Sequence, residues 1–246
     1  MKVLTVFAHP GQGSFCHAVL QRFDAGLKEA GHTNEIVDLY AIGFDPVLRD
    51  RDNPNWMDPD APDEILEQMH LKERIVGGAR GPISRLLARL LVAGRDTRGL
   101  IRFLQRRFRP RDVAEQQEKV ASAQALVFIA PVWFVGFPAI LKGWIERVFT
   151  LGFAFRIKPE AWRGDISGRV PLLHHEKALI IQTTLFDGRA YGTGLGDAMK
   201  VLVDDFGFRY PGIEKVERVF FHAIHGVDDA TRRGYLDQAQ RLGREF

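Results

Sequence analysis

Five short segments rich in aliphatic and β-branched residues recur along the chain at wide intervals. Apolar segments of this length are typical of strands that are covered on both faces of a parallel sheet. The pattern predicts strands over Lys2–Ala8, Asn34–Leu39, Ala125–Ala130, Lys177–Thr183 and Val216–Ile224.

The segments between these strands repeat apolar residues at helical spacing. Apolar positions three and four residues apart predict helices after Ser14, over Asp112–Ala123, Pro138–Phe149 and Asp197–Phe206, and after Asp228. Strand and helix therefore alternate, which is the pattern of right-handed βαβ units. We predict an α/β fold with a doubly wound five-stranded parallel sheet of order 2-1-3-4-5. In such a sheet the ligand site lies beyond the carboxyl ends of strands 1, 3 and 4.

Composition places the chain among ordinary globular proteins, whereas its charge divides it into two parts. The 246 residues are 46% hydrophobic and 26% charged, which fits one domain over 1–246 and excludes wholesale disorder. The segment Lys72–Arg111 holds twelve basic and two acidic residues, a net charge of +10, and the remainder of the chain carries −7. The formal net charge of +3 hides this contrast. We expect a basic helical insertion, over about residues 55–111, on an acidic body.

The insertion contains two apolar stripes with arginines between them. One stripe recurs at helical spacing over 83–91, and a similar one follows over 100–108. Two amphipathic helices separated by Gly94–Gly99 are therefore predicted. The stripes fit a packed hairpin or a dimer interface, a lid over a ligand pocket, or peripheral contact with an anionic membrane through 72–111. Nucleic acid is not an expected partner, because the apolar faces need burial and the body is acidic.

The loop after the first strand has features of a phosphate site. His9–Ser14 contains two glycines and leads into a helix, whose first N–H groups and dipole attract anions. The loop matches neither the G-x-G-x-x-G fingerprint nor a Walker A loop, so a tight turn capped by Ser14 explains it equally well. Cys16 follows, and as the single cysteine it fits a reducing cytosol. We expect Cys16 to pack as a small apolar residue.

The loop after the third strand is apolar and aromatic from Pro131 to Pro138. At the carboxyl end of a strand, such residues form a dry wall for a flat ring system. A hydrophobic cap over the sheet or a subunit interface would use the same residues. A phospho-acceptor receiver domain is excluded, because it needs acidic residues where this chain has His9 and Pro131.

Histidine and glycine patterns elsewhere change the picture little. His222 and His225 are three residues apart at the end of a strand, which places them on opposite faces, so no metal site is expected. Gly192–Gly196 is rich in glycine, and we interpret it as a mobile turn. No serine stands in a G-x-S-x-G motif, so a hydrolase of that kind is not indicated.

Several motifs together resemble the NAD(P)H:quinone oxidoreductase family. They are the run Pro138-Ala139-Ile140-Leu141-Lys142-Gly143-Trp144, the motifs Phe7-Ala8-His9-Pro10 and Phe153-Ala154-Phe155, and Thr183-Thr184 followed by Tyr191. The resemblance covers about Met1–Pro46 and Asp112 onward, and leaves out most of the basic insertion. It implies a flavodoxin-like fold, a bound FAD or FMN, and NAD(P)H as the co-substrate that passes hydride to flavin N5. A quinone is the implied acceptor, and a homodimer is the expected assembly.

The resemblance also assigns site residues by position. Tyr191 is the implied catalytic residue, because its phenol can donate a hydrogen bond to charge that develops on the reduced ring. The implied flavin-binding residues are His9, Ser14, Phe15, Cys16, Pro131, Val132, Trp133, Phe134, Thr183, Thr184 and Tyr191. The implied substrate pocket is formed by Trp133, Phe155 and Ile157.

Three positions depart from the family pattern. Leu185 and Phe186 stand where the family often has two glycines, which alters how closely the edge of the flavin is approached. Trp133 stands one residue earlier than the tryptophan of many relatives. Asp197 replaces a histidine that some members place six residues after the tyrosine. This replacement leaves water, Tyr191 itself or another route as the source of the proton.

Three functions are compatible with these residues. The first is a flavin-dependent NAD(P)H:quinone oxidoreductase that works in two half-reactions at one site. The second uses an azo or nitro aromatic as the acceptor, because an apolar slot beside a flavin accepts many flat molecules. The third is a flavin-bound redox-sensing protein that regulates a partner at a membrane. We expect a cytoplasmic protein, with the inner face of a membrane as the alternative location, and the motifs do not choose NADH or NADPH, FAD or FMN.

Overall fold

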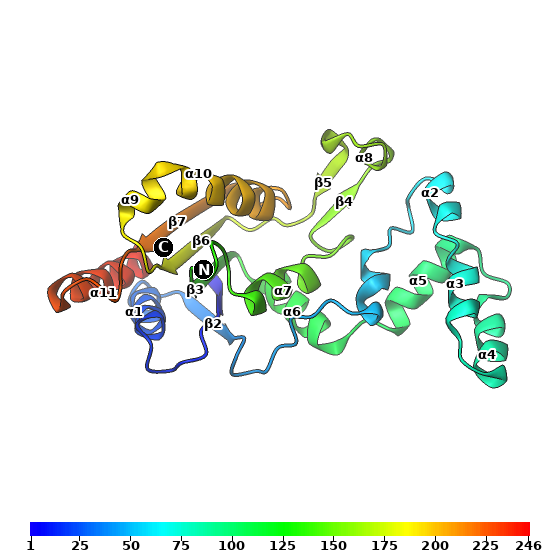
Figure 1. The fold of residues 1–246 in the computed structure, drawn as a ribbon, viewed down its shortest axis with the longest axis horizontal. Coiled ribbons are helices and arrows are strands. Elements are labelled where there is room, and N and C mark those ends of the chain that lie inside the picture. The colour runs from blue at the N-terminus through cyan, green and yellow to red at the C-terminus, as the bar shows by residue number, and fades with distance from the viewer.

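The computed structural model describes residues 1–246, and a five-stranded parallel sheet lies at its centre (Figure 1). The strands are β1 (Lys2–Phe7), β2 (Thr33–Asp38), β3 (Ala125–Pro131), β6 (Lys177–Thr183) and β7 (Lys215–Phe221). They lie in the order β2-β1-β3-β6-β7, and every neighbouring pair is parallel. The predicted order 2-1-3-4-5 is therefore confirmed, as is a helical insertion after the second strand.

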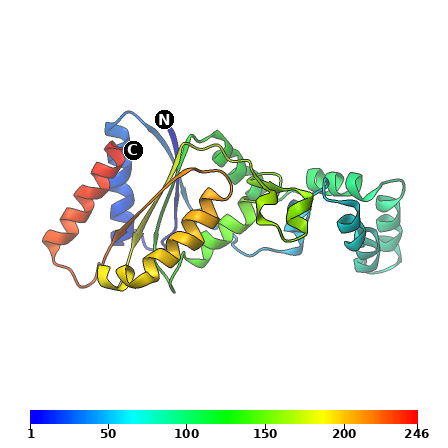
Figure 2. The same ribbon diagram turned by 90° about the horizontal axis from the view of Figure 1, so that it is seen from above.

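Helices cover both faces of this sheet (Figure 2). On one face lie α1 (Phe15–Glu29) and α11 (Asp229–Arg244), packed against each other. On the other face lie α6 (Arg111–Ser122) and α7 (Ala139–Val148), together with a helical segment that ends at Arg209. The N-termini of α1 and α11 have the caps expected from sequence, since the hydroxyl of Ser14 and the carboxylate of Asp228 each accept a backbone N–H of the helix that follows.

The helical segment that ends at Arg209 is continuous over four short pieces. They are α9 (Gly188–Ala190), the π-helical turn η3 (Tyr191–Leu195), α10 (Gly196–Met199) and the π-helical η4 (Lys200–Arg209). The interpretation of Gly192–Gly196 as a turn holds only at Thr193 and Gly194, which leave the helical backbone conformation, whereas the residues around them are helical. The two helical parts meet at a kink at Gly194, where a φ of 99° favours a residue without a Cβ.

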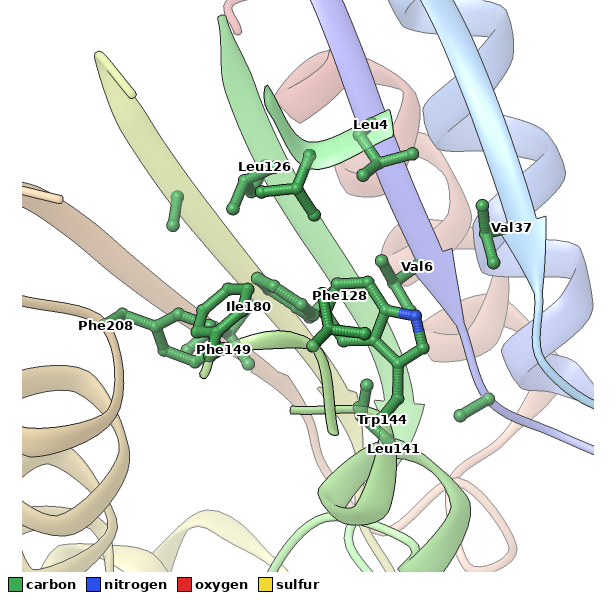
Figure 3. Close-up of a cluster of buried hydrophobic side chains, with 14 of the residues drawn as sticks. Leu4, Val6, Val37, Leu126, Phe128, Leu141, Trp144, Phe149, Ile180 and Phe208 are labelled. Atoms are coloured by element: carbon green, nitrogen blue, oxygen red, sulfur yellow. The ribbon is translucent and has the colours of Figure 1, made fainter. Parts of the chain in front are cut away.

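Alternate side chains of the strands build two apolar layers. Phe128 of β3 points to the face of α7, where its ring lies 6.2 Å from that of Trp144 and 4.5 Å from that of Phe208 (Figure 3). The neighbouring Val127 and Ile129 point to the opposite face and pack under α1. This alternation is the ordinary consequence of a pleated strand, and it explains why the central strands are apolar throughout.

The chain between β2 and α6 forms an arm that extends away from the sheet (Figures 1 and 2). The arm comprises η1 (Asp50–Trp56), α2 (Asp63–Gln68), α3 (Leu71–Gly78), α4 (Pro82–Val92) and α5 (Thr97–Arg107). Helices α4 and α5 agree with the two predicted amphipathic helices. The arm has a small core of its own, which contains Ala61, Leu66, Leu71, Leu100, Ile101 and Leu104. None of the helices in the structure combines the length and the apolar content that crossing a bilayer requires.

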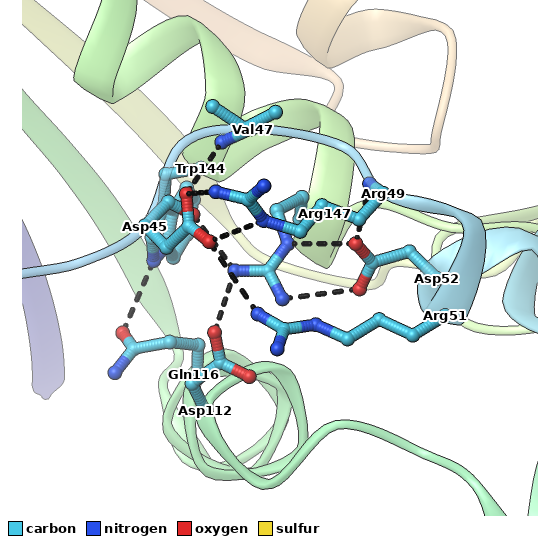
Figure 4. A network of polar contacts seen from close by, with 9 residues as sticks. All are labelled: Asp45, Val47, Arg49, Arg51, Asp52, Asp112, Gln116, Trp144 and Arg147. Carbon is cyan, nitrogen blue, oxygen red and sulfur yellow. Dashed lines mark hydrogen bonds and ion pairs between the residues drawn. The ribbon is translucent and has the colours of Figure 1, made fainter.

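A buried ion-pair network joins the base of the arm to the body (Figure 4). The guanidinium of Arg147, fully buried in α7, donates to both carboxylate oxygens of Asp52 in η1, at 3.0 and 3.3 Å. It also donates to the carboxylate of Asp112 in α6 and to the carbonyl of Asp45. Burial by itself lowers the pKa of Arg147, but the bonds to Asp112 and Asp52 raise it above its ordinary value. Arg147 therefore stays charged and holds three elements together.

A short antiparallel hairpin stands beside the arm. It consists of β4 (Phe155–Ile157) and β5 (Arg169–Pro171), with α8 (Pro159–Trp162) and η2 (Ile166–Gly168) in the connection between them. Trp162 packs against the core of the arm. The hairpin thus belongs to the arm side of the molecule, away from α9 (Figure 1).

Candidate active site

A hollow of about 580 Å³ opens beyond the carboxyl ends of β3, β6 and β7. This is the edge at which a doubly wound sheet binds its ligand. Its lining is mostly apolar and comprises Pro131, Val132, Trp133, Phe134, Val135, Thr183, Thr184, Leu185, Phe186, Tyr191, Leu195, Ile224 and His225. Seven residues predicted from sequence, namely Pro131–Phe134, Thr183, Thr184 and Tyr191, line this one hollow.

The apolar rim of the hollow is a strained turn. Trp133 and Gly136 exchange two backbone hydrogen bonds of 3.1 Å, which leaves Phe134 and Val135 as the central residues of a tight hairpin. Both have positive φ angles, 45° and 65°, a conformation that usually requires Asn or Gly. Phe134 is fully exposed and Val135 is more than half exposed. Strain of this kind persists where the surroundings require a particular arrangement, here an aromatic rim over the hollow.

Tyr191 closes the inner side of the hollow. Its side chain is buried, and its ring lies 4.8 Å from that of Phe220 and 5.1 Å from that of His222. Burial raises the pKa of Tyr191, and a hydrogen bond with Thr184 offsets part of the rise. The phenol is therefore protonated at neutral pH and can act as a hydrogen-bond donor.

The loop after β1 lies next to this hollow and offers unbonded amides. The ring of His9 lies 5.8 Å from that of Trp133, which brings the two loops together. The hydroxyl of Ser14 accepts from the amide of His17, so this serine caps α1 as expected. Backbone amides without a hydrogen bond here include those of Gln12, Gly13, Phe15 and Cys16. Free amides at a helix N-terminus suit a phosphate group.

The side chains of Phe15 and Cys16 point away from the loop. The ring of Phe15 packs 6.5 Å from that of Tyr235. Cys16 is buried, which confirms the expected packing role, and burial raises the pKa of its thiol to about 12 while a hydrogen bond with Thr183 lowers it in part. Cys16 can therefore contact a ligand through its amide but not through its buried thiol.

Phe155 and Ile157 are not brought together with Trp133 within one chain. Both lie on β4, where Phe155 packs 6.2 Å from Trp56 and 5.4 Å from Tyr210 at a separate hollow of about 280 Å³. The cause is topological. Helix α7 starts at the carboxyl edge of the sheet and runs back to the amino edge, so residues that follow it lie away from the site.

Another hollow, of about 640 Å³, lies between the arm and the body. Its lining is mainly polar, with Asp58 and Asp60 opposite Arg106, Arg109 and Arg156. It contains none of the residues predicted for the site. Because it lacks an apolar wall and lies away from the carboxyl edge of the sheet, we place the candidate site at the hollow beside Tyr191.

Some lining residues were missed from sequence. Ile224 and His225 follow β7 at the same carboxyl edge as the predicted loops, so their position after the last strand could have indicated them. Leu195 was hidden within the segment interpreted as a turn. Leu185 and Phe186, noted only as departures from a pattern, form an exposed part of the rim.

The residues present fit a flavin nucleotide. An apolar hollow with an aromatic rim can hold a flat ring system, and the four free amides beside it can hold a phosphate. The phenol of Tyr191 supplies a donor at the inner wall. The arrangement therefore provides what a bound flavin needs at its ring and at its phosphate.

Comparisons with known proteins agree with this architecture. A model of the flavodoxin-like fold family matches residues 1–242. The chain is 24% identical over 240 residues to an uncharacterized NAD(P)H oxidoreductase of Haemophilus influenzae, across 97% of this chain and 92% of that protein. An NAD(P)H:quinone oxidoreductase from Methanothermobacter marburgensis superposes with a TM-score of 0.68 at 28% identity, covering 100% of this chain and 96% of that chain.

An FMN-dependent NADH-azoreductase from Bacillus anthracis, solved in complex with FMN, shares the fold. It superposes with a TM-score of 0.62 at 17% identity and covers 99% of this chain and 98% of that chain. The match to the family model extends over nearly the whole chain. The chain therefore belongs to the flavodoxin-like fold family, and its homologues include proteins named NAD(P)H:quinone oxidoreductases.

Proposed function

We propose that the protein is a flavin-dependent NAD(P)H:quinone oxidoreductase that works in two half-reactions at one site. The observation that supports it most is the gathering of seven predicted residues around one apolar hollow beside unbonded helix amides. The overall reaction consumes NAD(P)H, a proton and a quinone, and yields NAD(P)+ and a hydroquinone. Two electrons move as a pair, so no one-electron product has to leave the site.

Each part of the hollow has a role in this proposal. A bound flavin supplies the redox chemistry, because it accepts hydride and passes two electrons to an acceptor. The amides at the start of α1 hold the phosphate, and Val132, Trp133 and Phe134 pack against the flat ring and exclude water. Tyr191 donates a hydrogen bond from its phenol toward the polar edge of the ring.

The test of this proposal starts from the absorption spectrum of the purified protein. We expect flavin bands in the visible range and uptake of FAD or FMN by protein stripped of its ligand. FAD is the flavin that the resemblance implies, whereas FMN is bound in the Bacillus anthracis neighbour. Identification of the flavin released on denaturation decides between the two. A colourless protein that takes up neither flavin would overturn the proposal.

An azo or nitro aromatic is the second candidate acceptor. The rim supports it, because Phe134, Leu185 and Phe186 are exposed and surround the mouth without polar groups that would select a quinone. Steady-state rates with a quinone and an azo dye of similar size, at a fixed NAD(P)H concentration, separate the candidates. A higher kcat/KM for the azo dye would assign the enzyme to that class.

The arm supports a third candidate, a flavin-bound regulatory protein at a membrane. Its helix α4 exposes Leu86, Leu87 and Leu90, each by more than half. Such a protein would bind flavin tightly and show negligible turnover of NAD(P)H. Measurable turnover with any acceptor would remove this candidate.

A further inference from the structure

Three rings, two from the end of β7 and one from η3, form a group beside the hollow. His222 follows β7, and its imidazole lies 5.5 Å from the ring of Phe220 at an interplanar angle of 29°. The ring of Tyr191 in η3 packs against both, 4.8 Å from Phe220 and 5.1 Å from the imidazole of His222. This group brings a titratable imidazole against the one phenol that lines the hollow, and the proposed function has not yet used it.

The hydroxyl of Thr184 connects His222 to Tyr191. Its oxygen lies 3.2 Å from Nδ1 of His222, and Thr184 is also the hydrogen-bonding neighbour that lowers the pKa of Tyr191 in part. The hydroxyl donates its single proton to the carbonyl of Phe186 at 2.7 Å, so it can only accept from His222. Nδ1 must therefore carry the proton of the neutral imidazole.

The other ring nitrogen of His222, Nε2, is then free to accept a proton. It makes no hydrogen bond within the chain, and it is not completely buried. The imidazole is half-buried, so Nε2 is within reach of water. Donors and acceptors thus lead from Nε2 through Nδ1 to the Thr184 oxygen, and Thr184 in turn neighbours the phenol of Tyr191.

The backbone around His222 is held against the loop that contains Thr184. The amides of Ala223 and Ile224 donate to the carbonyls of Phe186 and Thr184, each at 3.1 Å. The carbonyl of His222 accepts from the hydroxyl of Tyr235 at 3.2 Å. Ala223 has a φ of 51°, a left-handed conformation that alanine rarely adopts. Local strain that is tied down by several bonds is typical of a residue placed for function.

We propose that His222 is the positioning residue of Tyr191, and that it returns a proton to the phenol through the hydroxyl of Thr184. This inference rests on the proposed function, in which reduction of a quinone consumes one proton beyond the hydride of NAD(P)H. When the phenol has given its proton away, Thr184 passes its hydroxyl proton to the Tyr191 oxygen and takes the Nδ1 proton of His222. His222 then takes one proton from water at Nε2, so each group gives one proton and receives one.

His222 would thereby supply the imidazole that is missing at position 197, where this chain has Asp197. Asp197 lies exposed on α10, whereas His222 contacts the Tyr191 ring directly. The sequence left the proton route open, and the structure offers one from a different strand.

The charges around His222 favour its neutral form. Burial lowers its pKa, and the carboxylate of Asp187 raises it in part. Asp187 is itself paired with Arg189 at 2.7 Å. The other titratable groups against the imidazole are the phenols of Tyr191 and Tyr235. At neutral pH the imidazole is therefore neutral and ready to accept a proton at Nε2.

The first experiment needs neither flavin nor turnover. Nitrogen-15 NMR of the histidine rings in the full chain distinguishes the tautomer with a proton on Nδ1 from that with a proton on Nε2. We expect His222 of the unmodified chain to show the Nδ1–H form. Thr184→Val removes the acceptor and should shift the population toward Nε2–H. A His222 that is already in the Nε2–H form in the unmodified chain would overturn the proposal, whatever the flavin content.

The second experiment separates proton supply from mere packing. His222→Asn keeps a donor near the position of Nδ1 but cannot take up a proton, so kcat for quinone reduction should fall about tenfold or more while KM for NAD(P)H stays the same. The fall should grow with pH, because protons then become scarce. His174→Asn, at an exposed histidine outside the hollow, is the matched control.

A double-mutant cycle tests the route through Thr184. If the hydroxyl carries the proton, His222→Asn should lower kcat much less on a Thr184→Val background than on the unmodified one. Equal and additive losses, or a His222→Asn enzyme with unchanged kcat and pH profile, would contradict the proposal. His222→Asn could fail to fold, which its thermal unfolding would show. In that case a comparison of kcat between Thr184→Val and Thr184→Ser tests the same route, since only serine keeps the hydroxyl.

Discussion

Two glycines set the distance between the helices on one face of the sheet. A Cβ atom at Gly26 of α1 would lie 2.0 Å from the carbonyl oxygen of Gln240, and one at Gly243 of α11 would lie 2.2 Å from that of Phe23. Gly26→Ala should therefore lower the free energy of unfolding by about 2 kcal/mol, because the clash outweighs the gain in helix propensity of about 1 kcal/mol. Urea unfolding of the two proteins measures the difference.

Gly234 provides the matched control for this substitution. It also lies in α11, but a Cβ there meets open space. Gly234→Ala should raise the free energy of unfolding by about 0.5–1 kcal/mol through helix propensity alone. If the Gly26→Ala protein were as stable as the Gly234→Ala protein, α1 and α11 could move apart with no loss in the free energy of unfolding.

Cys16 should be inert in the folded protein. Burial raises the pKa of its thiol to about 12 from an ordinary value of 9.0, so thiolate is scarce at pH 8. A disulfide reagent that releases a coloured thiol should react with Cys16 only as fast as the chain opens, and faster in urea. The unfolded thiol ionises above pH 9 while the folded one does not, so this thiol makes the protein less stable as pH rises from about 9 toward 12. Immediate labelling in native buffer would contradict the burial.

Tyr191 should matter for turnover and not for flavin binding. Tyr191→Phe keeps the buried ring and removes the phenol donor, so both half-reactions should slow by roughly 10–100-fold while flavin stays bound. Stopped-flow measurement of each half-reaction, beside the flavin content of the variant, gives the answer. Unchanged rates in both would remove Tyr191 from the mechanism.

At the residue scale, the sequence indicated which loops form the site but not which distant residues hydrogen-bond to each other there. Pro131–Phe134 and Thr183 were predicted together because the carboxyl ends of parallel strands meet at one edge. The bond between Thr184 and His222 joins residues 38 apart and depends on how the chain turns after β7. No local pattern indicates that turn, since Ala223 adopts its left-handed conformation under tertiary constraint.

At the element scale, the arm depends on one buried arginine. Arg147→Met should lower the free energy of unfolding by about 3–5 kcal/mol, because it leaves the buried carboxylate of Asp52 without its ion-pair partner. Limited proteolysis should then cut the arm first, near η1. Arg189→Ala, which breaks an exposed ion pair with Asp187, should cause no measurable loss. Equal stability of the two variants would mean that Asp52 finds another partner or water.

Sequence predicted the long elements better than the short ones. Strands of the sheet and helices such as α4 and α5 show a clear period over ten or more residues or a continuous apolar run. Elements η1 and α2 are six or seven residues long, too short for a period to appear. The helical residues around Gly194 were missed, because glycines usually indicate a turn.

At the scale of the whole molecule, charge and shape divide in the same place. The basic segment Lys72–Arg111 coincides with most of the arm, and the acidic remainder forms the body with the hollow. Figure 2 shows the arm standing clear of the sheet, far from α9. The arm of one chain therefore does not cover the hollow of the same chain. Contact of the arm with a second copy or with an anionic surface stays a prediction.

Helix α4 provides the means to test that contact. It exposes Ile83 by 75%, Leu86 by 58%, Leu87 by 60% and Leu90 by 61%, and its charged residues are all arginines. Exposed apolar side chains contribute little to folding of a single chain, so the pair Leu86→Ser and Leu87→Ser should leave the free energy of unfolding within about 0.5 kcal/mol. What should change is association. Sedimentation equilibrium measures whether two copies associate. Co-sedimentation with anionic vesicles, compared with neutral ones, measures binding to a membrane.

These two measurements distinguish the occupants because they respond differently to salt. Binding of the arginines to an anionic surface weakens as salt screens the charges, whereas apolar contact between two copies does not. We expect the unmodified chain to associate in one of the two assays and the doubly substituted chain to lose that association. If both chains sediment as monomers and ignore both kinds of vesicle, the apolar face of α4 is simply solvated. The arm would then be a packed appendage, and acceptor choice would depend on the hollow beside Tyr191 alone.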